Sequence, residues 1–324
     1  NEVLIHTGQH YDSNMSNIFF EELNIPKPNY NLGIKATSHG SQTGQMLIEL
    51  EKVFLDEKPD MVIVYGDTNS TLAGALCASK LLIPLVHIEA GLRSFNKAMP
   101  EEQNRIITDH LSQYLFTPTQ TAVQNLHNEN ISTGVFNVGD VMFDAILKFK
   151  EQAQKYSHIV ESLNSPDYML ATIHRAENTN NRDRLFSIFK ALNDCGKNIV
   201  LPMHPRTSKY LAEFEIPVGG NIQILPPQGY LDMISLQDNA QMIITDSGGV
   251  QKEAYFLHKP CITLREETEW IETLENDWNT LAGYDYNRIL NAINYSAPKG
   301  PQSAPFGTGN ASDIIVKQIT TQNL

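Results

Sequence analysis

Three acidic residues of the chain occupy positions where they could transfer protons. Asp67 and Glu89 each come directly after a short apolar segment, and Glu101 begins a predicted helix after Pro100. Ligands of open α/β sheets bind beyond the carboxyl ends of the strands, so three acids in consecutive loops favour general acid–base chemistry. Taken singly, Asp67 is equally consistent with a helix N-cap, and Glu101 with a favourable charge in the first turn of a helix.

A second motif, Asp-Ser-Gly-Gly-Val-Gln-Lys-Glu at residues 246–253, follows another apolar segment and opens a helix. Ser247, Gly248 and Gly249 would let backbone N–H groups approach an anion, and the helix N-terminus adds the positive end of its dipole. The motif therefore predicts a pyrophosphate-binding loop, with Glu253 within reach of a ribose diol. The alternative is a simple strand-to-helix turn capped by its Asp or Ser side chain.

Potential cations follow two further apolar segments in the second half of the chain. His174 and Arg175 follow one segment, and His204 and Arg206 follow the other. Both residue types suit phosphate oxygens, although a histidine beside Pro205 is also consistent with a plain turn. No histidine has the spacing of a metal ligand, so no metal is predicted. The chain has no Walker A, GxGxxG or GxSxG motif, which argues against P-loop enzymes, simple dinucleotide dehydrogenases and hydrolases.

Short apolar segments that alternate with helix-length segments must position these side chains. The predicted strands are residues 3–5, 61–65, 85–88, 169–173, 199–201, 222–225, 242–245 and 261–264. Such segments, bounded by polar turns, are typical of parallel strands buried on both faces, and the alternation predicts a doubly wound α/β fold. The pattern occurs twice, on either side of a polar helical stretch at about residues 148–167, so we expect two Rossmann-like domains.

Composition restricts the class of protein and its partners. The 324 residues include 41% hydrophobic and 19% charged residues, the balance of a globular enzyme. With 24 basic and 37 acidic residues the formal net charge is −13, which argues against nucleic acid as a partner. No apolar run approaches the roughly 20 residues needed to span a bilayer, so no membrane partner is expected. The three cysteines are widely spaced and lack a CxxC pair, which fits a reducing cytoplasm.

Five motifs resemble, in order, the signature motifs of the non-hydrolysing UDP-N-acetylglucosamine 2-epimerase family. They are residues 65–68, 87–93, 100–105, 172–178 and 245–253. The resemblance implies a glycosyltransferase-B fold, in which two Rossmann-like parallel-sheet domains face each other across a cleft. It implies that residues 1–150 carry the acid–base residues, that residues 151–309 bind UDP, and that a helix at 310–324 packs back on the first domain.

The family reaction removes the proton from carbon 2 of UDP-N-acetylglucosamine while UDP leaves carbon 1, and UDP then adds back with inversion at carbon 2. By resemblance, Asp67, Glu89 and Glu101 are the acid–base set, because two faces of carbon 2 require two proton-transfer groups. His174 would stabilise the departing diphosphate. The predicted substrate-binding residues are His10, Arg93, Glu102, Arg105, Arg175, Glu177, His204, Arg206, Gln228, Ser247, Gly248, Gly249, Glu253 and Trp270. The resemblance implies a UDP-sugar substrate, no cofactor and a homodimer.

The chain also departs from the family pattern. By resemblance it starts at the second family strand, so the first strand and a Gly-Thr-Arg-Pro-Glu loop are missing from the sequence. Trp270 stands where many relatives have a substrate-contacting Arg. Residues 266–272 look more like the branch that acts on UDP-2,3-diacetamido-2,3-dideoxy-glucuronic acid, unless Trp270 only packs the loop. That sugar, a glycosyltransferase of the same fold and a non-catalytic nucleotide-sugar-binding module are the alternatives.

Overall fold

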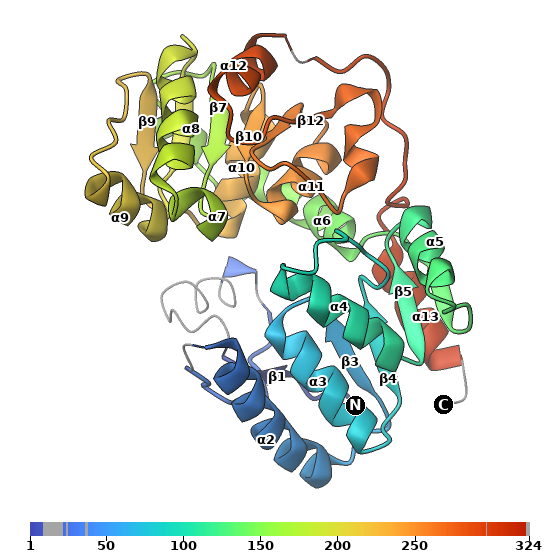
Figure 1. The fold of residues 1–324 in the computed structure, drawn as a ribbon. Coiled ribbons are helices and arrows are strands. Elements are labelled where there is room, and N and C mark those ends of the chain that lie inside the picture. The colour runs from blue at the N-terminus through green and yellow to red at the C-terminus, as the bar shows by residue number, and fades with distance from the viewer. Residues whose placement is uncertain (9–21, 24, 36–37, 296, 322–324) are drawn as a thin grey trace. The chain divides into compact units, whose positions relative to one another are not determined.

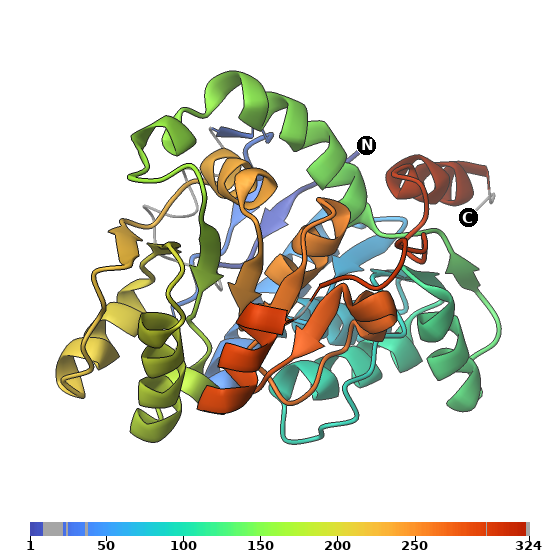
Figure 2. The same cartoon turned by 90° about the horizontal axis from the view of Figure 1, so that it is seen from above.

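The computed structural model describes residues 1–8, 22–23, 25–35, 38–295 and 297–321 (Figure 1 and, from above, Figure 2). The chain divides into two compact units. Unit 1 comprises Asn1–Asp144 and Ala304–Leu324, and unit 2 comprises Ala145–Ser303. The boundary falls within α6 (Val141–Tyr156), near the start of the polar stretch that the sequence marks as a connection.

Unit 1 is built on a four-stranded parallel sheet with the order β3-β4-β5-β6. Its strands are β3 (Val62–Tyr65), β4 (Leu85–Ile88), β5 (Tyr114–Thr117) and β6 (Val135–Asn137). A separate parallel pair is formed by β1 (Ile5–His6) and β2 (Tyr30–Asn31). The helices are α2 (His39–Glu57), α3 (Asn69–Lys80), α4 (Pro100–Leu111), α5 (Gln120–Asn128) and α13 (Ala311–Thr321).

The last helix, α13, packs on the sheet of unit 1 although it is distant in sequence. Ile315 is buried in a cluster with Val86, Phe116 and Val138. The carboxylate of Asp144 accepts the backbone N–H groups of residues 311 and 312 at 3.1 and 2.7 Å, so it caps the start of the helix. Burial of the apolar face and this cap together attach α13 to unit 1.

Unit 2 contains a six-stranded parallel sheet with the order β12-β11-β10-β7-β8-β9 (Figure 1). Its strands are β7 (Met169–Thr172), β8 (Ile199–Pro202), β9 (Ile222–Leu225), β10 (Ile243–Thr245), β11 (Cys261–Thr263) and β12 (Asn279–Leu281). The helices are α7 (Ala176–Thr179), α8 (Arg182–Asp194), α9 (Pro205–Glu213), α10 (Tyr230–Asn239), α11 (Gly248–Phe256) and α12 (Tyr286–Tyr295). Two 3-10 helices, η1 (Ile159–Ser162) and η2 (Ile271–Asp277), complete the unit.

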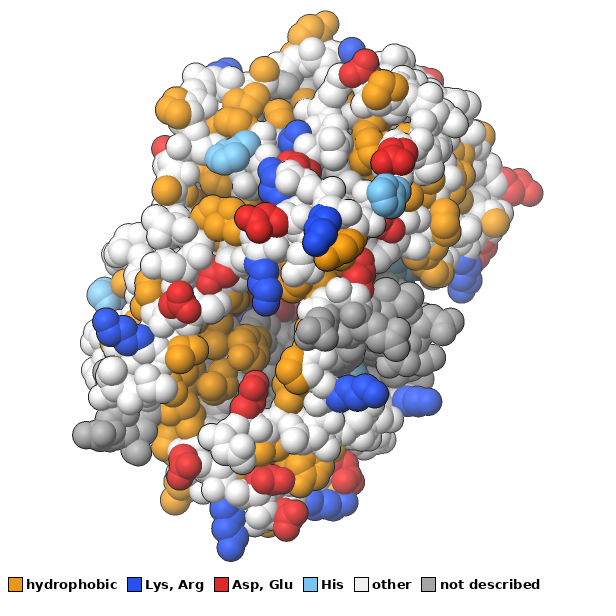
Figure 3. Space-filling model, turned by 180° about the vertical axis from the view of Figure 1, so that it is seen from behind, with side chains coloured by type: hydrophobic (Ala, Val, Ile, Leu, Met, Phe, Trp, Pro, Cys, Tyr) orange, Lys and Arg blue, Asp and Glu red, His pale blue; other side chains and the backbone are white. Residues whose placement is uncertain are grey.

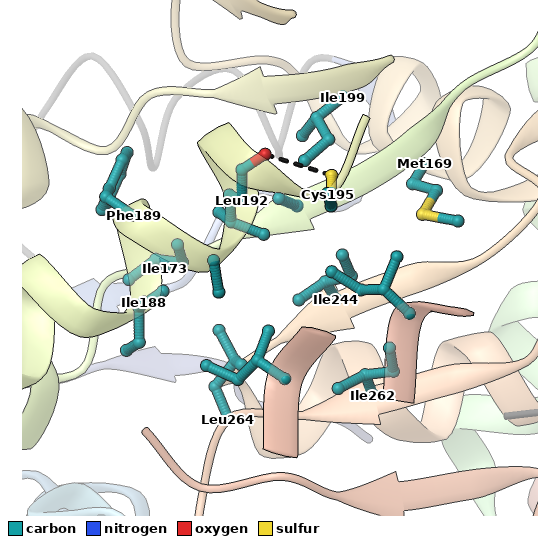
Figure 4. Close-up of a cluster of buried hydrophobic side chains, with 14 of the residues drawn as sticks. Met169, Ile173, Ile188, Phe189, Leu192, Cys195, Ile199, Ile244, Ile262 and Leu264 are labelled. Atoms are coloured by element: carbon teal, nitrogen blue, oxygen red, sulfur yellow. Dashed lines mark hydrogen bonds between the residues drawn. The ribbon is translucent and has the colours of Figure 1, made fainter. Parts of the chain in front are cut away.

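The main core of unit 2 lies between its sheet and helices such as α8. Ile188 and Phe189 of α8 pack with Ile244 of β10 and Ile262 of β11 in one fully buried cluster (Figure 4). Every residue of β7, β10 and β11 is buried, as in central parallel strands covered on both faces. The predicted α/β fold with parallel sheets is therefore confirmed.

None of the helices in the described part of the chain is both long and apolar enough to cross a bilayer. On the face drawn in Figure 3, basic side chains are interspersed with acidic ones and form no extended basic area.

Candidate active site

Asp67 lies in the turn between β3 and α3, and its carboxylate does not cap the helix. The turn requires a left-handed backbone at Gly66, where φ is +61°. The N-cap of α3 is Thr68, whose hydroxyl accepts the N–H of Thr71 at 3.4 Å. Asp67 Oδ2 instead accepts a hydrogen bond from Arg105 Nη2 at 2.5 Å. The N-cap interpretation of Asp67 is wrong, and Arg105 fixes the direction of this carboxylate.

Glu89 lies directly after β4, the strand next to β3, in a strained backbone conformation. Its φ is +73°, a region that costs a residue with a side chain about 1–3 kcal/mol and that occurs often at functional sites. Its N–H donates to the carbonyl of Phe116 at 3.0 Å, which pins the turn. A Cβ on Gly66 would stand 3.6 Å from Glu89 Oε1. The structure thus brings the carboxylate of Glu89 beside the turn that holds Asp67.

Glu101 lies in the first turn of α4, where its charge interacts favourably with the helix dipole. Asn104 and Arg105, three and four residues later, face the Asp67 turn, since Asn104 Nδ2 donates to the Asp67 carbonyl at 2.9 Å. Residues three and four apart share one face of a helix, so Glu101 projects from the side of α4 that meets this turn. Glu101 is partly exposed, and none of the described residues donates a hydrogen bond to its side chain.

Glu102 and Arg105, both predicted to bind substrate, are buried and use their charges within the protein. Only 1% of Glu102 is exposed. Its carboxylate accepts the N–H groups of Ser94 and Phe95 at 2.9 and 2.8 Å, and Arg105 Nη1 at 2.6 Å. Burial acts to raise the pKa of Glu102, but these hydrogen bonds and the charge of Arg105 together lower it. These contacts favour a positioning role for the pair.

Arg93, also predicted to bind substrate, likewise pairs with carboxylates of unit 1. Its Nε and Nη2 form a bidentate pair with the Glu129 carboxylate at 2.6 and 2.7 Å, and its Nη1 donates to Asp109 Oδ2 at 2.7 Å. Burial alone would lower the pKa of Arg93, but the hydrogen bonds and charges of the two carboxylates raise it. Arg93 therefore stays charged inside unit 1 and has its guanidinium occupied.

His87 and Asp109, which sequence reasoning missed, extend this network to the Asp67 turn. His87 is fully buried; its Nδ1 lies 2.6 Å from Asp109 Oδ1 and its Nε2 lies 2.8 Å from the Gly66 carbonyl oxygen. Both partners are acceptors, so the ring donates from both nitrogens and is an imidazolium. Burial opposes that charge, but Asp109 and the two hydrogen bonds raise the pKa of His87 and, reciprocally, His87 and Arg93 lower the pKa of Asp109. A histidine in an otherwise apolar strand was the available sequence signal.

In unit 2, the fully buried carboxylate of Asp246 shapes the turn after β7. It accepts the N–H groups of His174 and Arg175, each at 3.0 Å, and Asn178 Nδ2 at 3.1 Å. The His174 side chain is 39% exposed, with Nδ1 3.6 Å from Asp246 Oδ1. Asp246 therefore presents His174 at the carboxyl end of β7, although the sequence analysis gave Asp246 no role beyond an alternative cap.

His204 stacks on His174, with ring centroids 5.5 Å apart. It is also the N-cap of α9, because its Nδ1 accepts the N–H of Arg206 at 3.1 Å. Burial, together with the charges of His174 and Arg206, lowers the pKa of His204. The lowered pKa favours a neutral ring. A neutral ring also fits the hydrogen bond, because Nδ1 can accept the Arg206 N–H only when it carries no proton.

Three other predicted substrate contacts engage their own unit. Arg206 donates to Thr179 Oγ1 at 2.9 Å and to a neighbouring amide. Glu177 pairs with Arg184, and Gln228 Nε2 donates to the Pro226 carbonyl at 2.6 Å. His10 lies outside the described residues. Among the described residues, no group of three or more His, Cys, Asp or Glu side chains is arranged to hold a metal ion.

The predicted pyrophosphate loop forms the N-terminus of α11. Ser247 is its N-cap, with Oγ accepting the N–H of Val250 at 3.4 Å, and Gly248 is the first helical residue. Further along the helix, Glu253 is buried and accepts Gln237 Nε2 at 2.7 Å. Burial raises the pKa of Glu253 despite its hydrogen bonds from Gln237 and Tyr230. The cap, the glycines and the dipole together form a site suited to an anion.

Trp270 is almost completely buried, with 4% exposed. Its ring is covered by Lys252, whose Nζ lies 3.8 Å from the ring centroid. This burial favours the interpretation that Trp270 packs the loop before η2 rather than offering a surface to the sugar.

Three comparisons with known proteins bear on this arrangement. Residues 1–320 match the family model described as UDP-N-acetylglucosamine 2-epimerase. A UDP-N-acetylglucosamine 2-epimerase homolog of Methanococcus maripaludis is 52% identical over 98% of this chain and 91% of its own length. The UDP-2,3-diacetamido-2,3-dideoxy-D-glucuronate 2-epimerase of Pseudomonas aeruginosa is 48% identical, with the same coverage. The crystal structure of the Methanocaldococcus jannaschii UDP-GlcNAc 2-epimerase in complex with UDP-GlcNAc and UDP has a TM-score of 0.91 and 48% identity, covering 98% of this chain and 91% of that one.

Proposed function

The chain belongs to the UDP-N-acetylglucosamine 2-epimerase family, and on that premise we propose that it interconverts UDP-N-acetylglucosamine and UDP-N-acetylmannosamine. The observation that carries the proposal is the pair of carboxylates at adjacent strand ends of unit 1. A Cβ on Gly66 would stand 3.6 Å from Glu89 Oε1. The residue after Gly66 is Asp67, whose Oδ2 accepts a hydrogen bond from Arg105 Nη2 at 2.5 Å. Inversion at carbon 2 needs proton transfer on two faces, which two differently held carboxylates can supply.

The reaction balances without a co-reactant. A carboxylate takes the proton from carbon 2, the C–H electrons form a double bond to carbon 1, and UDP leaves with the electrons of the C1–O bond. UDP then adds back to carbon 1, and a second group delivers a proton to the opposite face of carbon 2. Asp67, Glu89 and Glu101 are the proposed acid–base set. His174 stabilises the diphosphate as it departs.

Unit 2 supplies the proposed UDP-binding residues. The N–H groups of Ser247, Gly248 and Gly249 bind the diphosphate at the α11 N-terminus, and Glu253 contacts the ribose. Arg93, Glu102 and Arg105 act as positioning residues, because their charged atoms are occupied within unit 1. In this assignment the first domain is residues 1–150 with the helix at 310–324, the second is residues 151–309, and the two compact units support that division.

Proton NMR tests the activity directly. The protein is incubated with UDP-N-acetylglucosamine in deuterated water, and both the manno epimer and loss of the carbon-2 proton signal are expected. Absence of the epimer together with absence of exchange rejects this substrate.

A second candidate substrate is UDP-2,3-diacetamido-2,3-dideoxy-glucuronic acid, because the Pseudomonas aeruginosa relative with that name is 48% identical. The ratio of kcat/KM for the two UDP-sugars decides between them. A ratio above one in favour of the diacetamido sugar would assign the chain to that branch.

The proposed enzyme is a homodimer and works in the cytoplasm. Three buried free cysteines, Cys77, Cys195 and Cys261, support a reducing compartment. Size-exclusion chromatography with light scattering measures the oligomeric state, and a mass of one chain would contradict the dimer.

A further inference from the structure

Arg265 lies two residues after β11, at the carboxyl end of the strand next to β10. The turn after β10 provides Ser247 and Gly248. Arg175 follows β7, the neighbour of β10 on its other side. Two arginines from the two adjacent strands therefore flank the N-terminus of α11.

The geometry around Gly248 defines the position that these arginines share. A Cβ on Gly248 would stand 3.7 Å from Arg265 Nη1, 3.7 Å from Arg175 Nη2 and 2.7 Å from Glu269 Oε1. Arg265 Nη2 pairs with Glu269 Oε2 at 3.0 Å. One carboxylate and two guanidinium groups thus meet at the first residue of the helix, where the dipole favours negative charge.

Arg265 has hydrogen-bonding capacity that its own unit does not use. The residue is 5% exposed, and its Nη1 is buried without a hydrogen bond to any residue that the structure describes. A buried donor without an acceptor costs free energy, and such a group calls for an explanation such as a ligand. Because this nitrogen faces the same point as the α11 N-terminus, an anion bound there would satisfy it.

We infer that Arg265 is a further diphosphate-binding residue and that Glu269 is the counterion that holds its guanidinium beside Gly248 until a diphosphate arrives. The inference rests on the proposed function, because it names a residue of the same UDP site. A diphosphate offers planar pairs of acceptor oxygens that match a guanidinium, and its charge replaces that of the Glu269 carboxylate. No bond is made or broken; the change is an exchange of ion-pair partners.

Calorimetry with UDP and with uridine on the full chain tests the inference, since the two ligands differ by the diphosphate. Arg265→Gln is expected to weaken UDP binding roughly 10–100-fold, the effect of losing a hydrogen bond to a charged group, and to leave uridine binding unchanged. Arg288→Gln is the control, because Arg288 is an exposed arginine of unit 2 paired with Glu266 at 2.9 Å. The control is expected to bind both ligands as the parent does.

A second variant excludes a trivial loss of folding. Arg265→Gln with Glu269→Gln removes both charges, so no buried carboxylate is left unpaired. Arg265→Lys keeps a positive charge for Glu269 and is expected to bind UDP with intermediate affinity. If a folded variant without Arg265 keeps the parent ratio of UDP to uridine affinity, the inference is wrong while the epimerase proposal stands. If the parent itself does not bind UDP, the proposed function fails instead.

Discussion

Units 1 and 2 both collect charged residues at the carboxyl ends of parallel strands, but they use the charges differently. In unit 1, Arg93 and Arg105 each pair with two carboxylates of their own unit and are almost fully buried. In unit 2, His174 is 39% exposed and Arg265 has a nitrogen without a hydrogen bond to the described residues. In unit 1, Arg105 fixes the direction of the Asp67 carboxylate, whereas in unit 2 Arg265 Nη1 faces the N-terminus of α11.

The largest effect is expected on turnover when the proposed acid–base residues of unit 1 are neutralised. Asp67→Asn, Glu89→Gln and Glu101→Gln should each lower turnover roughly 10²–10⁴-fold, the usual loss for an acid–base group. UDP binding should survive, because the proposed diphosphate contacts lie in unit 2. Turnover by NMR and UDP affinity by calorimetry check both statements, with Glu49→Gln on the surface of α2 as control. Near-normal turnover in two of the three variants would contradict the assignment.

Filling the space at the α11 N-terminus is expected to weaken UDP binding, whereas the unit 1 variants are expected to lose turnover. Gly248→Ala adds a methyl group 2.7 Å from Glu269 Oε1 and 3.7 Å from Arg265 Nη1. UDP affinity should fall about tenfold or more, because at least one charge-assisted hydrogen bond is lost. Gly220→Ala in the same unit is the matched control, since an added Cβ there meets no atom within 4 Å. Equal UDP affinity in both variants would move the diphosphate site elsewhere.

A pH titration tests whether the buried charges of unit 1 are structural. The pKa of His87 is raised in the folded state, so its stabilisation is complete below about pH 6.5 and is lost as pH rises through the folded pKa. The parent should therefore lose stability above about pH 6.5, by roughly 1–3 kcal/mol for a hydrogen-bonded charge, and His87→Gln should lose less over that range.

The two units can be followed separately in that experiment. Both tryptophans, Trp270 and Trp278, lie in unit 2, so fluorescence during urea unfolding reports unit 2 and far-UV circular dichroism reports both. The control is His127→Gln, at an exposed position of α5 in unit 1. Identical pH dependence in His87→Gln and the parent would show that His87 is not charged in the folded protein.

Sequence reasoning predicted the family and the parallel α/β fold, and both are confirmed. Continuous apolar segments identified strands such as β3, β4 and β7. The strands β2, β5, β6 and β12 were missed; β6 and β12, with sequences VFN and NTL, are three-residue strands that contain polar residues. Because β6 and β12 are short and partly polar, neither forms an apolar segment that the sequence analysis could recognise as a strand.

Partners of the charged residues were harder to predict than the residues themselves. Arg93 and Arg105 were predicted to face substrate, but their carboxylate partners come from positions up to 38 residues away. His87 and Asp109 also form their hydrogen bond across a long sequence separation, 22 residues. Such pairings depend on how β4, α4 and α5 pack, and residue type and local spacing do not contain that information.

The smallest effect is expected at Trp270, where the sequence suggested sugar specificity. The ring is 4% exposed and covered by Lys252 at 3.8 Å, so within unit 2 it has no face for a sugar. Trp270→Phe keeps an aromatic face for the Lys252 cation, and it should change the ratio of kcat/KM for the two candidate UDP-sugars less than about threefold. It should also lower the stability of unit 2, because a smaller ring leaves space in a packed loop. A change of tenfold or more in the ratio, with UDP affinity unchanged, would instead place Trp270 against the sugar and reopen the diacetamido branch on structural grounds.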